Sequence, residues 1–130
     1  MSGIFSLREV RTEQLANINE GLSLDIPGLL YGYFGGGENV LATNVSTIDR
    51  LDFSTETIAS PVIPAKLSSA KNSLTGSSSS SYGYFGGGLN PTPAVVSTID
   101  RLDFSTETVT VPSQKLTQAR SNLAAVSNAN

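Results

Sequence analysis

The sequence contains neither cysteine nor histidine, and each absence narrows what the protein can do. Without cysteine there is no disulfide framework and no thiolate metal site. Without histidine there is no Ser-His or Cys-His activation of a nucleophile, and the commonest metal ligand is missing. We therefore expect a protein that is not an enzyme, binds no cofactor or metal, and depends on packing and backbone pairing for its fold.

Charged side chains are also scarce, at only 15% of the residues. Eight basic and eleven acidic residues give a net charge of −3, with no block of like charge. Electrostatic capture of nucleic acid or of an anionic membrane is therefore not expected. No apolar run approaches the ~18 residues of a membrane-spanning helix, so we also expect no membrane insertion.

The residues that are abundant favour strands and turns. Apolar residues make up 38% of the chain, and glycine, serine, threonine and asparagine fill much of the remainder. This composition is typical of all-β proteins, whereas helix-rich chains contain more alanine, glutamate, lysine and leucine. A chain of 130 residues has room for one small core.

An internal repeat occupies residues 31–130. The segment Tyr31–Gly37 recurs at Tyr82–Gly88, 51 residues along the chain (82 − 31). Val45–Thr57 recurs letter for letter at Val96–Thr108, again 51 residues along (96 − 45). Repeats of this period are typical of solenoids, propellers and arrays.

A third, weaker match completes the unit. Lys66–Lys71 corresponds to Lys115–Arg120 at a distance of 49 residues (115 − 66). We therefore divide the chain into an N-terminal arm, residues 1–30, and two tandem repeats, residues 31–81 and 82–130.

The second copy indicates the strands of a unit. Tyr82–Phe85 is a short aromatic strand closed by three glycines, and Ser97–Phe104 is a second strand-like run. Ser105–Thr108 is typical of a hairpin turn that leads into a third strand, Val109–Val111. The segments between the first two strands, 38–44 and 89–94, are expected to be exposed loops on one edge of the assembly.

A crossover leads from this hairpin to the last strand of the unit. Leu123–Val126 is a small apolar run that suits an inner strand covered on both faces. About four strands per unit follow. Ser77–Ser81 occupies the place in copy one where copy two has Val126–Asn130, and we interpret it as a turn between strands rather than a domain linker.

Strict alternation of apolar residues fails in the strand 97–104. Ile99 falls on the opposite face from Leu102 and Phe104. Either a bulge intervenes or both faces are packed, as they are in a propeller blade between its neighbours.

The candidate structural residues are two glycine triplets and one repeated carboxylate. A glycine takes positive φ readily and allows another chain to approach closely; the triplets are Gly35, Gly36, Gly37, Gly86, Gly87 and Gly88. Asp49 and Asp100 are expected to accept hydrogen bonds from turn amides and to pair with Arg120 or its counterpart Lys71. Acid/base chemistry or cation binding by the repeated carboxylates is the alternative, although their spacing matches no calcium loop.

The N-terminal arm is expected to contain a helix. Ser6 and Glu9 fit a capping box, and Gly21 is a stop signal. An apolar stripe on one face of this helix, together with Phe5, would pack on the β-domain or dock on a partner; the candidate docking residues are Phe5, Leu7, Val10, Leu15, Ile18 and Leu22.

These motifs together resemble a kelch repeat: a glycine triplet, a long loop, a strand ending Asp-Phe-Ser, and a Leu-x-x-Ala-Arg crossover. Ile58 and Val109 stand where a kelch unit usually has tryptophan. The chain is also similar to Tyr-Gly-Tyr-Phe-Gly-Gly-Gly repeat proteins of marine tailed phages, including cyanophages, which often open with Gly-Ile-Phe-Ser-Leu as residues 3–7 do here. The resemblance implies an all-β fold of two kelch-like four-stranded units, or β-propeller blades, behind a short helical or extended arm.

The resemblance also implies a function and a location. It indicates a phage virion structural protein, such as a fibre, a tail appendage or a capsid decoration, that binds other virion proteins through its arm and its β-repeats. The alternative is a receptor-binding module for host-surface carbohydrate that uses Tyr33, Tyr84 and the two loops. Since two blades cannot close a propeller, we also expect a homo-oligomer in which Leu123–Val126 of one chain pairs beside Tyr31–Phe34 of the next. The alternatives are that Leu29 and Leu30 complete the first blade within the chain, or that the natural protein continues past Asn130 with more repeats.

Overall fold

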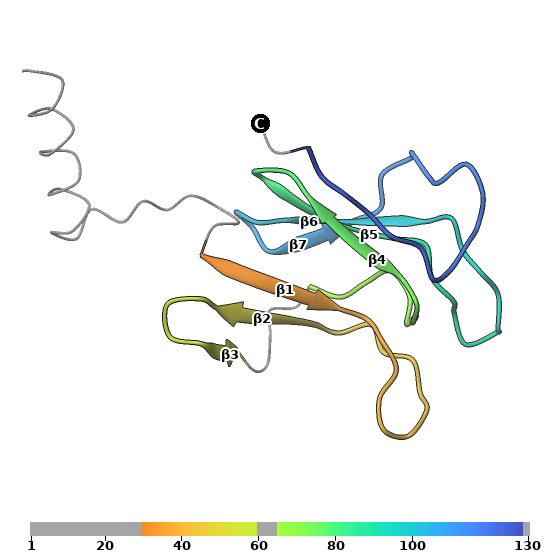
Figure 1. Cartoon of the computed structure of the whole chain (residues 1–130), viewed down its shortest axis with the longest axis horizontal. Helices are drawn as coiled ribbons and strands as arrows, with labels where there is room; N and C mark the ends of the chain where they lie inside the picture. Colours follow the sequence, from red (N-terminus) through yellow and green to blue (C-terminus); the bar gives the residue numbers. More distant parts are fainter. Residues whose placement is uncertain (1–29, 60–64, 129–130) are drawn as a thin grey trace, which may run out of the picture.

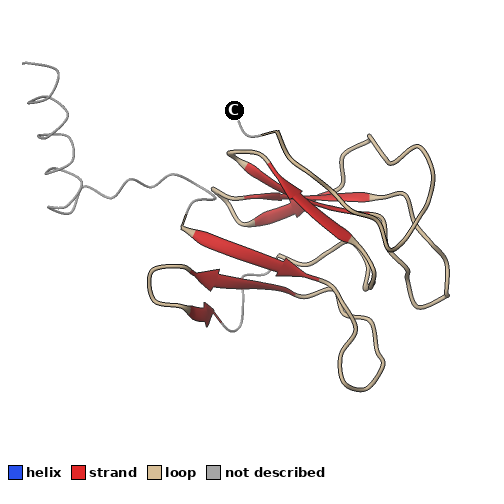
Figure 2. Ribbon diagram, viewed as in Figure 1, coloured by secondary structure: helices blue, strands red, loops and turns tan. Residues whose placement is uncertain are grey.

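A computed structural model describes residues 30–59 and 65–128. This part of the chain is all-β, with seven strands in two antiparallel sheets and no helix (Figures 1 and 2). The strands are β1 Tyr31–Gly35, β2 Ile48–Asp52, β3 Thr57–Ala59, β4 Thr75–Ser78, β5 Tyr82–Gly86, β6 Ile99–Asp103 and β7 Thr108–Thr110. The all-β expectation is confirmed, whereas the arm and its docking residues Phe5, Leu7, Val10, Leu15, Ile18 and Leu22 lie outside the described residues.

The two sheets share a core but differ in size. The first has the order β1-β2-β3, and the second has the order β4-β5-β6-β7. In both, the aromatic strand pairs in the same register with the Ile-Asp-Arg-Leu-Asp strand, so that Tyr31 lies opposite Asp52 and Tyr82 opposite Asp103. The second sheet has one strand more because β4, from the end of repeat one, pairs with β5.

Three strand expectations need correction. The described part of repeat two forms three strands rather than four, β5 to β7, whereas repeat one forms four, β1 to β4, the last of which belongs to the second sheet. Leu123–Val126 is not a strand, since it has no ladder partner, although the Ser77 hydroxyl donates a hydrogen bond to the Val126 carbonyl at 3.2 Å. Ser77 and Ser78 are strand rather than turn because pairing with β5 outweighs their weak strand preference.

The hairpin turns are fixed by the same side-chain contacts in both repeats. The Asp52 carboxylate accepts hydrogen bonds from the Ser54 amide and hydroxyl, and Asp103 does the same with Ser105. The hydroxyl contacts hold the pKa of both carboxyl groups below the ordinary value. Such turns bring β3 and β7 back onto β2 and β6 without help from distant residues.

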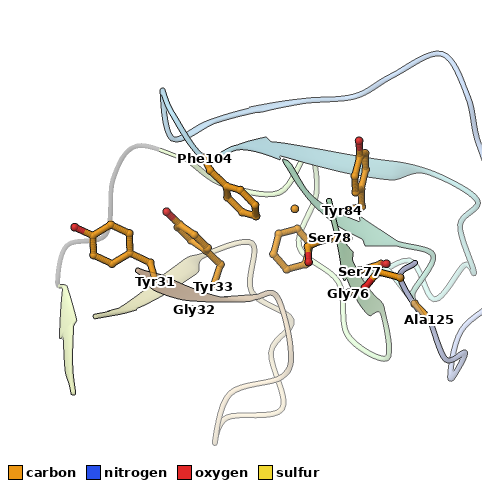
Figure 3. A pocket seen from close by; sticks show the side chains of 12 residues that line it. Tyr31, Gly32, Tyr33, Gly76, Ser77, Ser78, Tyr84, Phe104 and Ala125 are labelled. Carbon is orange, nitrogen blue, oxygen red and sulfur yellow. The ribbon is translucent and has the colours of Figure 1, made fainter. Parts of the chain in front are cut away.

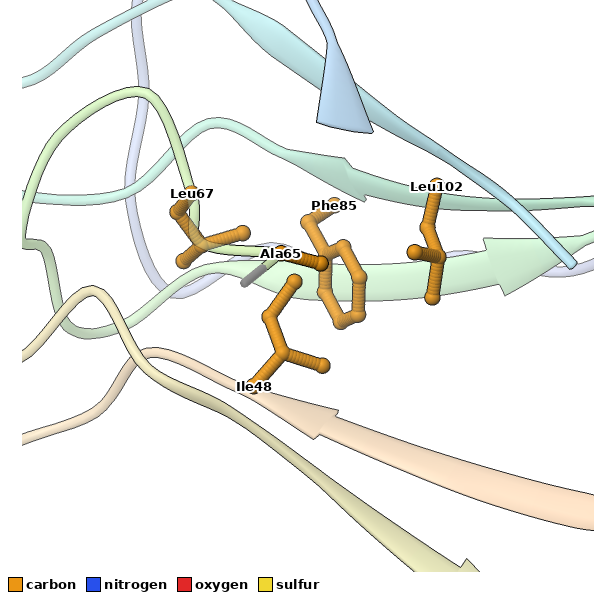
Figure 4. Packing of buried hydrophobic residues seen from close by; sticks show 5 residues of the cluster. All are labelled: Ile48, Ala65, Leu67, Phe85 and Leu102. Carbon is orange, nitrogen blue, oxygen red and sulfur yellow. The ribbon is translucent and has the colours of Figure 1, made fainter. Parts of the chain in front are cut away.

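A small apolar core lies between the two sheets. It consists of Ile48, Ala65, Leu67, Phe85 and Leu102, all buried (Figure 4). Leu102 on β6 is buried, and so is its neighbour Asp100 two residues earlier, while the ladder between β5 and β6 is continuous from Tyr82 to Gly86. No bulge therefore intervenes, and the two faces of β6 differ: Asp100 and Leu102 share the buried face, while Ile99 lies on the opposite, partly buried face.

The two long loops lie beside each other, as expected. Residues from both loops line one surface depression, and the Asn44 side-chain amide donates a hydrogen bond to the Leu89 carbonyl at 3.0 Å. Figure 1 shows the loops leaving the ends of β1 and β5 at one end of the molecule. The expectation that equivalent loops project from one edge is confirmed.

The second glycine of each triplet occupies a site that no other residue fits. Gly36 has φ +72° and Gly87 has φ +68°. A Cβ atom at these positions would lie 2.7 Å from the Lys71 carbonyl oxygen and 2.6 Å from that of Arg120. The first glycines, Gly35 and Gly86, are ordinary strand residues with no positive φ.

We expect Gly36→Val and Gly87→Val each to lower the free energy of unfolding by about 2 kcal/mol or more, because strain and crowding add. Chemical denaturation followed by circular dichroism measures the change. Gly76→Val is the matched control, since its Cβ would meet only the Tyr84 carbonyl oxygen at 3.9 Å. Equal stabilities for all three variants would contradict the prediction.

Candidate functional site: the repeat junction

The junction between the two repeats is built around a buried ion pair. The Lys71 ammonium lies 2.6 Å from an Asp100 carboxylate oxygen, and both side chains are 0% exposed. The other Asp100 oxygen accepts a hydrogen bond from the Ser68 amide at 3.0 Å, and Lys71 also reaches the Thr98 hydroxyl at 3.4 Å. Both charges are therefore compensated, and the crossover of repeat one is fixed to β6 of repeat two.

A second polar cluster joins the repeats at the turn before β7. The Glu107 carboxylate accepts hydrogen bonds from the Tyr33 hydroxyl, at 3.0 Å, and from the Arg50 guanidinium. The Tyr33 ring stacks on Phe104 with 5.4 Å between centroids. Burial, together with the Glu107 contact, raises the pKa of Tyr33, and the hydrogen bond to Glu107 raises the pKa of Arg50.

The first glycine of repeat one allows the sheets to approach closely at this junction. A Cβ atom on Gly35 would lie 2.9 Å from the Phe85 ring, so the ring packs directly on the backbone of β1. The equivalent position in repeat two, Gly86, has only Ile99 within reach, at 3.9 Å. The close contact exists only where a following repeat is present.

An open groove runs beside the junction, which we call the junction groove (Figure 3). Its volume is about 430 Å³, and its wall combines aromatic rings, glycine backbone and serine hydroxyls. The residues that line it are Tyr31, Gly32, Tyr33, Gly76, Ser77, Ser78, Gly83, Tyr84, Phe85, Phe104, Ala125 and Ser127. It lies between β1, whose outer edge no described segment pairs with, and β4 and β5 of the second sheet.

The structure divides the expected carboxylate sites into one that is paired and one that is not. Asp100 accepts a turn amide and pairs with Lys71, as the sequence predicts. Asp49 and Arg120, the equivalents of Asp100 and Lys71, are both exposed, and neither forms an ion pair with a described residue. The expected pairing of Arg120 is therefore not formed among the described residues, because no described carboxylate lies within reach of it.

Sequence reasoning named Tyr33 only as a candidate sugar-binding residue and did not predict the contacts that join three residues at the junction. Tyr33, Arg50 and Glu107 come from two repeats and meet only because the sheets pack together. The exact repetition of all three types, at Tyr84, Arg101 and Glu56, was the available signal. Tyr33 and Tyr84 line one groove, as a joint role in ligand binding requires, but the two loops line a different depression.

Two other kinds of site were sought in residues 30–59 and 65–128. Within these ranges no cluster of three or more potential metal-binding side chains occurs. No helix of the described chain is long and apolar enough to cross a membrane.

We expect Lys71→Met to lower the free energy of unfolding by about 3–5 kcal/mol, because it leaves the Asp100 carboxylate buried without its partner. Denaturant unfolding of the purified chain measures the loss. Lys115→Met is the matched control, since Lys115 is exposed in the equivalent crossover, and its effect should stay within about 0.5 kcal/mol. Similar small effects of both substitutions would contradict the role assigned to the pair.

Because of Tyr33, the stability of the folded chain is expected to depend on pH in the alkaline range. Because its pKa is raised in the folded chain, the unfolded chain loses this proton first, and stability falls as the pH rises above 10, the ordinary value. We expect Tyr33→Phe to be less stable than the parent by about 1 kcal/mol near neutrality, through loss of the Glu107 contact. That difference should shrink above pH 10, as measured by unfolding curves at a series of pH values. A difference that is constant with pH would refute this assignment.

The chain was also compared with known proteins. No protein-family model matches it, and no curated protein sequence matches it significantly.

Proposed function

We propose that this chain is a structural protein of a phage particle, a fibre, tail appendage or capsid decoration, that acts through protein–protein contacts and catalyses no reaction. The observation that supports the structural role is the repeat junction. The residues of its two polar clusters have equivalents at the outer ends of the pair that form no ion pair or side-chain hydrogen bond with a described residue: Asp49, Glu56, Tyr84, Arg101 and Arg120. The phage assignment is supported by the resemblance of the Tyr-Gly-Tyr-Phe-Gly-Gly-Gly repeats to virion proteins of marine tailed phages.

Each sheet is, in this proposal, a kelch-like propeller blade. Three features support it: a 51-residue period, a glycine turn after the second strand of the second sheet, and a first strand of that sheet supplied by the preceding repeat. Blades are sandwiched between neighbours and cannot bury both faces alone. A protein with two blades and exposed outer faces is suited to assembly, which is the task of a virion component.

A second candidate function is recognition of host-surface carbohydrate. The junction groove favours it, because Tyr31, Tyr33 and Tyr84 line a concave surface together with the Ser77 and Ser78 hydroxyls. Aromatic rings offer an apolar body that sugar rings stack on, and hydroxyls offer hydrogen bonds. The loops, which line a separate depression, would contribute to a sugar site only at a distance from these rings.

Detection of the protein in purified particles tests the structural role. We expect mass spectrometry of gradient-purified virions to find the chain at a fixed stoichiometry, and a cryo-EM map to place its β-repeats on the particle. Absence of the chain from particles that are otherwise complete would refute the proposal. Binding on a glycan array that Tyr84→Ala abolishes, with the protein absent from the particle body, would favour the carbohydrate alternative instead.

A further inference from the structure

We propose that copies of this chain associate head to tail, with the end of repeat two of one copy docked on the start of repeat one of the next, through the contacts that join the two repeats within a chain. The inference rests on the proposed structural role and names its partner, a second copy of the chain. The junction between repeats one and two within the chain shows how one repeat docks on another, and it is the template for the contact between copies.

The first element of the template is the buried ion pair. Lys71 of repeat one and Asp100 of repeat two form it inside the chain. Arg120 stands 49 residues after Lys71, and Asp49 stands 51 residues before Asp100, so the same opposite charges face outward at the two ends. Arg120 of one copy therefore pairs with Asp49 of the next.

The Arg120 end is already held in the docking conformation. The Arg120 amide donates to the Val96 carbonyl at 3.2 Å, as the Lys71 amide does to Val45. The Arg120 carbonyl accepts from the Gly88 amide at 2.9 Å, and the Lys71 carbonyl accepts from Gly37 at 2.8 Å. The crossover of repeat two thus has the backbone contacts of the crossover that makes the internal junction.

The start of repeat one, at the opposite end of the chain, exposes the surface that the proposed contact would cover. Phe34 is 60% exposed, whereas its equivalent Phe85 is 7% exposed against Gly35. Phe53 is 54% exposed, whereas its equivalent Phe104 stacks on Tyr33. Two aromatic rings that the internal junction covers are therefore uncovered at the start of repeat one, as expected for a surface that receives another repeat.

The polar cluster at Glu107 is reproduced by equivalent residues. Arg101 lies over the Tyr82 ring at 4.7 Å, just as Arg50 lies over Tyr31 at 4.5 Å. Glu56 has φ +55°, close to the φ of +53° at Glu107, so both carboxylates leave the same kind of turn. Between copies, Tyr84 and Arg101 would bind Glu56 as Tyr33 and Arg50 bind Glu107.

The backbone provides the last element. β4 pairs with β5 so that Thr75 lies opposite Gly86 and Ser78 opposite Gly83. The equivalents of Thr75 and Ser78, 49 residues later, are Ala124 and Ser127. The equivalents of Gly86 and Gly83, 51 residues earlier, are Gly35 and Gly32. The same register between two copies places Ala124 opposite Gly35 and Ser127 opposite Gly32. Residues 124–127 of one copy then pair with the outer edge of β1 in the next, beside the junction groove.

Charge reversal tests the contact in the full 130-residue chain. We expect the parent chain to be an oligomer in size-exclusion chromatography with light scattering. Asp49→Lys and Arg120→Glu should each weaken self-association about thirtyfold or more, because each places two like charges opposite each other in the contact. The double variant Asp49→Lys/Arg120→Glu restores an opposite-charge pair at every contact and should recover the oligomer.

Controls separate loss of the contact from loss of the fold. Asp49 and Arg120 are exposed in the single chain, so circular dichroism of both single variants should match the parent. Gln118→Glu adds a charge in the same crossover and should leave the oligomer intact, because Gln118 is exposed and its equivalent Ser69 stays exposed beside the internal junction. A second variant that lacks residues 124–130 should be monomeric and folded.

Three results would overturn the inference: a monomeric parent chain, single variants that associate like the parent, or a double variant that fails to recover. A monomeric chain that is nevertheless found in virions would overturn the head-to-tail contact alone and leave the structural role standing. An oligomer that is absent from particles would support the contact and remove the virion assignment.

Discussion

The buried pair of Lys71 and Asp100 sets the relation between the two sheets. Neither charge has access to water, so each depends on the other and on the Ser68 amide and the Thr98 hydroxyl. Transfer of two charges out of water costs about as much as their attraction returns, so the pair contributes less to net stability than to the choice of arrangement. Any other placement of the sheets would leave a buried charge uncompensated, and this constraint fixes where the core residues meet.

Identical sequences have different surroundings in this protein because the surroundings come from the neighbouring repeat. Phe34 and Phe85 occupy equivalent strand positions, yet one is exposed and the other is buried. Asp49 and Asp100 differ in the same way. In a repeat protein, stability is close to a sum of unit terms and interface terms, and a unit without a neighbour lacks the interface term. Docking between copies would supply it.

Local features were accessible from the sequence and long-range ones were not. The glycine turns, the hairpin at residues 53–56 and the paired loops follow from residue type and spacing, and the structure has them. Leu123–Val126 reads as a strand but has no partner in the described chain, because strand formation needs a ladder as well as a preference. Ser77 and Ser78 illustrate the converse, a poor strand sequence that pairs with β5. The contact of Tyr33 with Glu107 joins residues 74 apart, which no local pattern reveals.

Under the proposed head-to-tail contact, polar matching would explain how the outer edge of β1, which no described segment pairs with, is protected from unspecific pairing. An unpaired strand edge invites pairing with any other strand, and an apolar junction would accept many registers. Here a strand that adds to β1 must also place a cation at Asp49 and donors at Glu56, because the internal junction pairs both equivalents, Asp100 and Glu107. A strand in a shifted register would bury at least one of these carboxylates without compensation, which costs several kcal/mol. The charges therefore restrict the edge to a partner that has the same crossover in the same register, and the repeat unit itself meets that requirement.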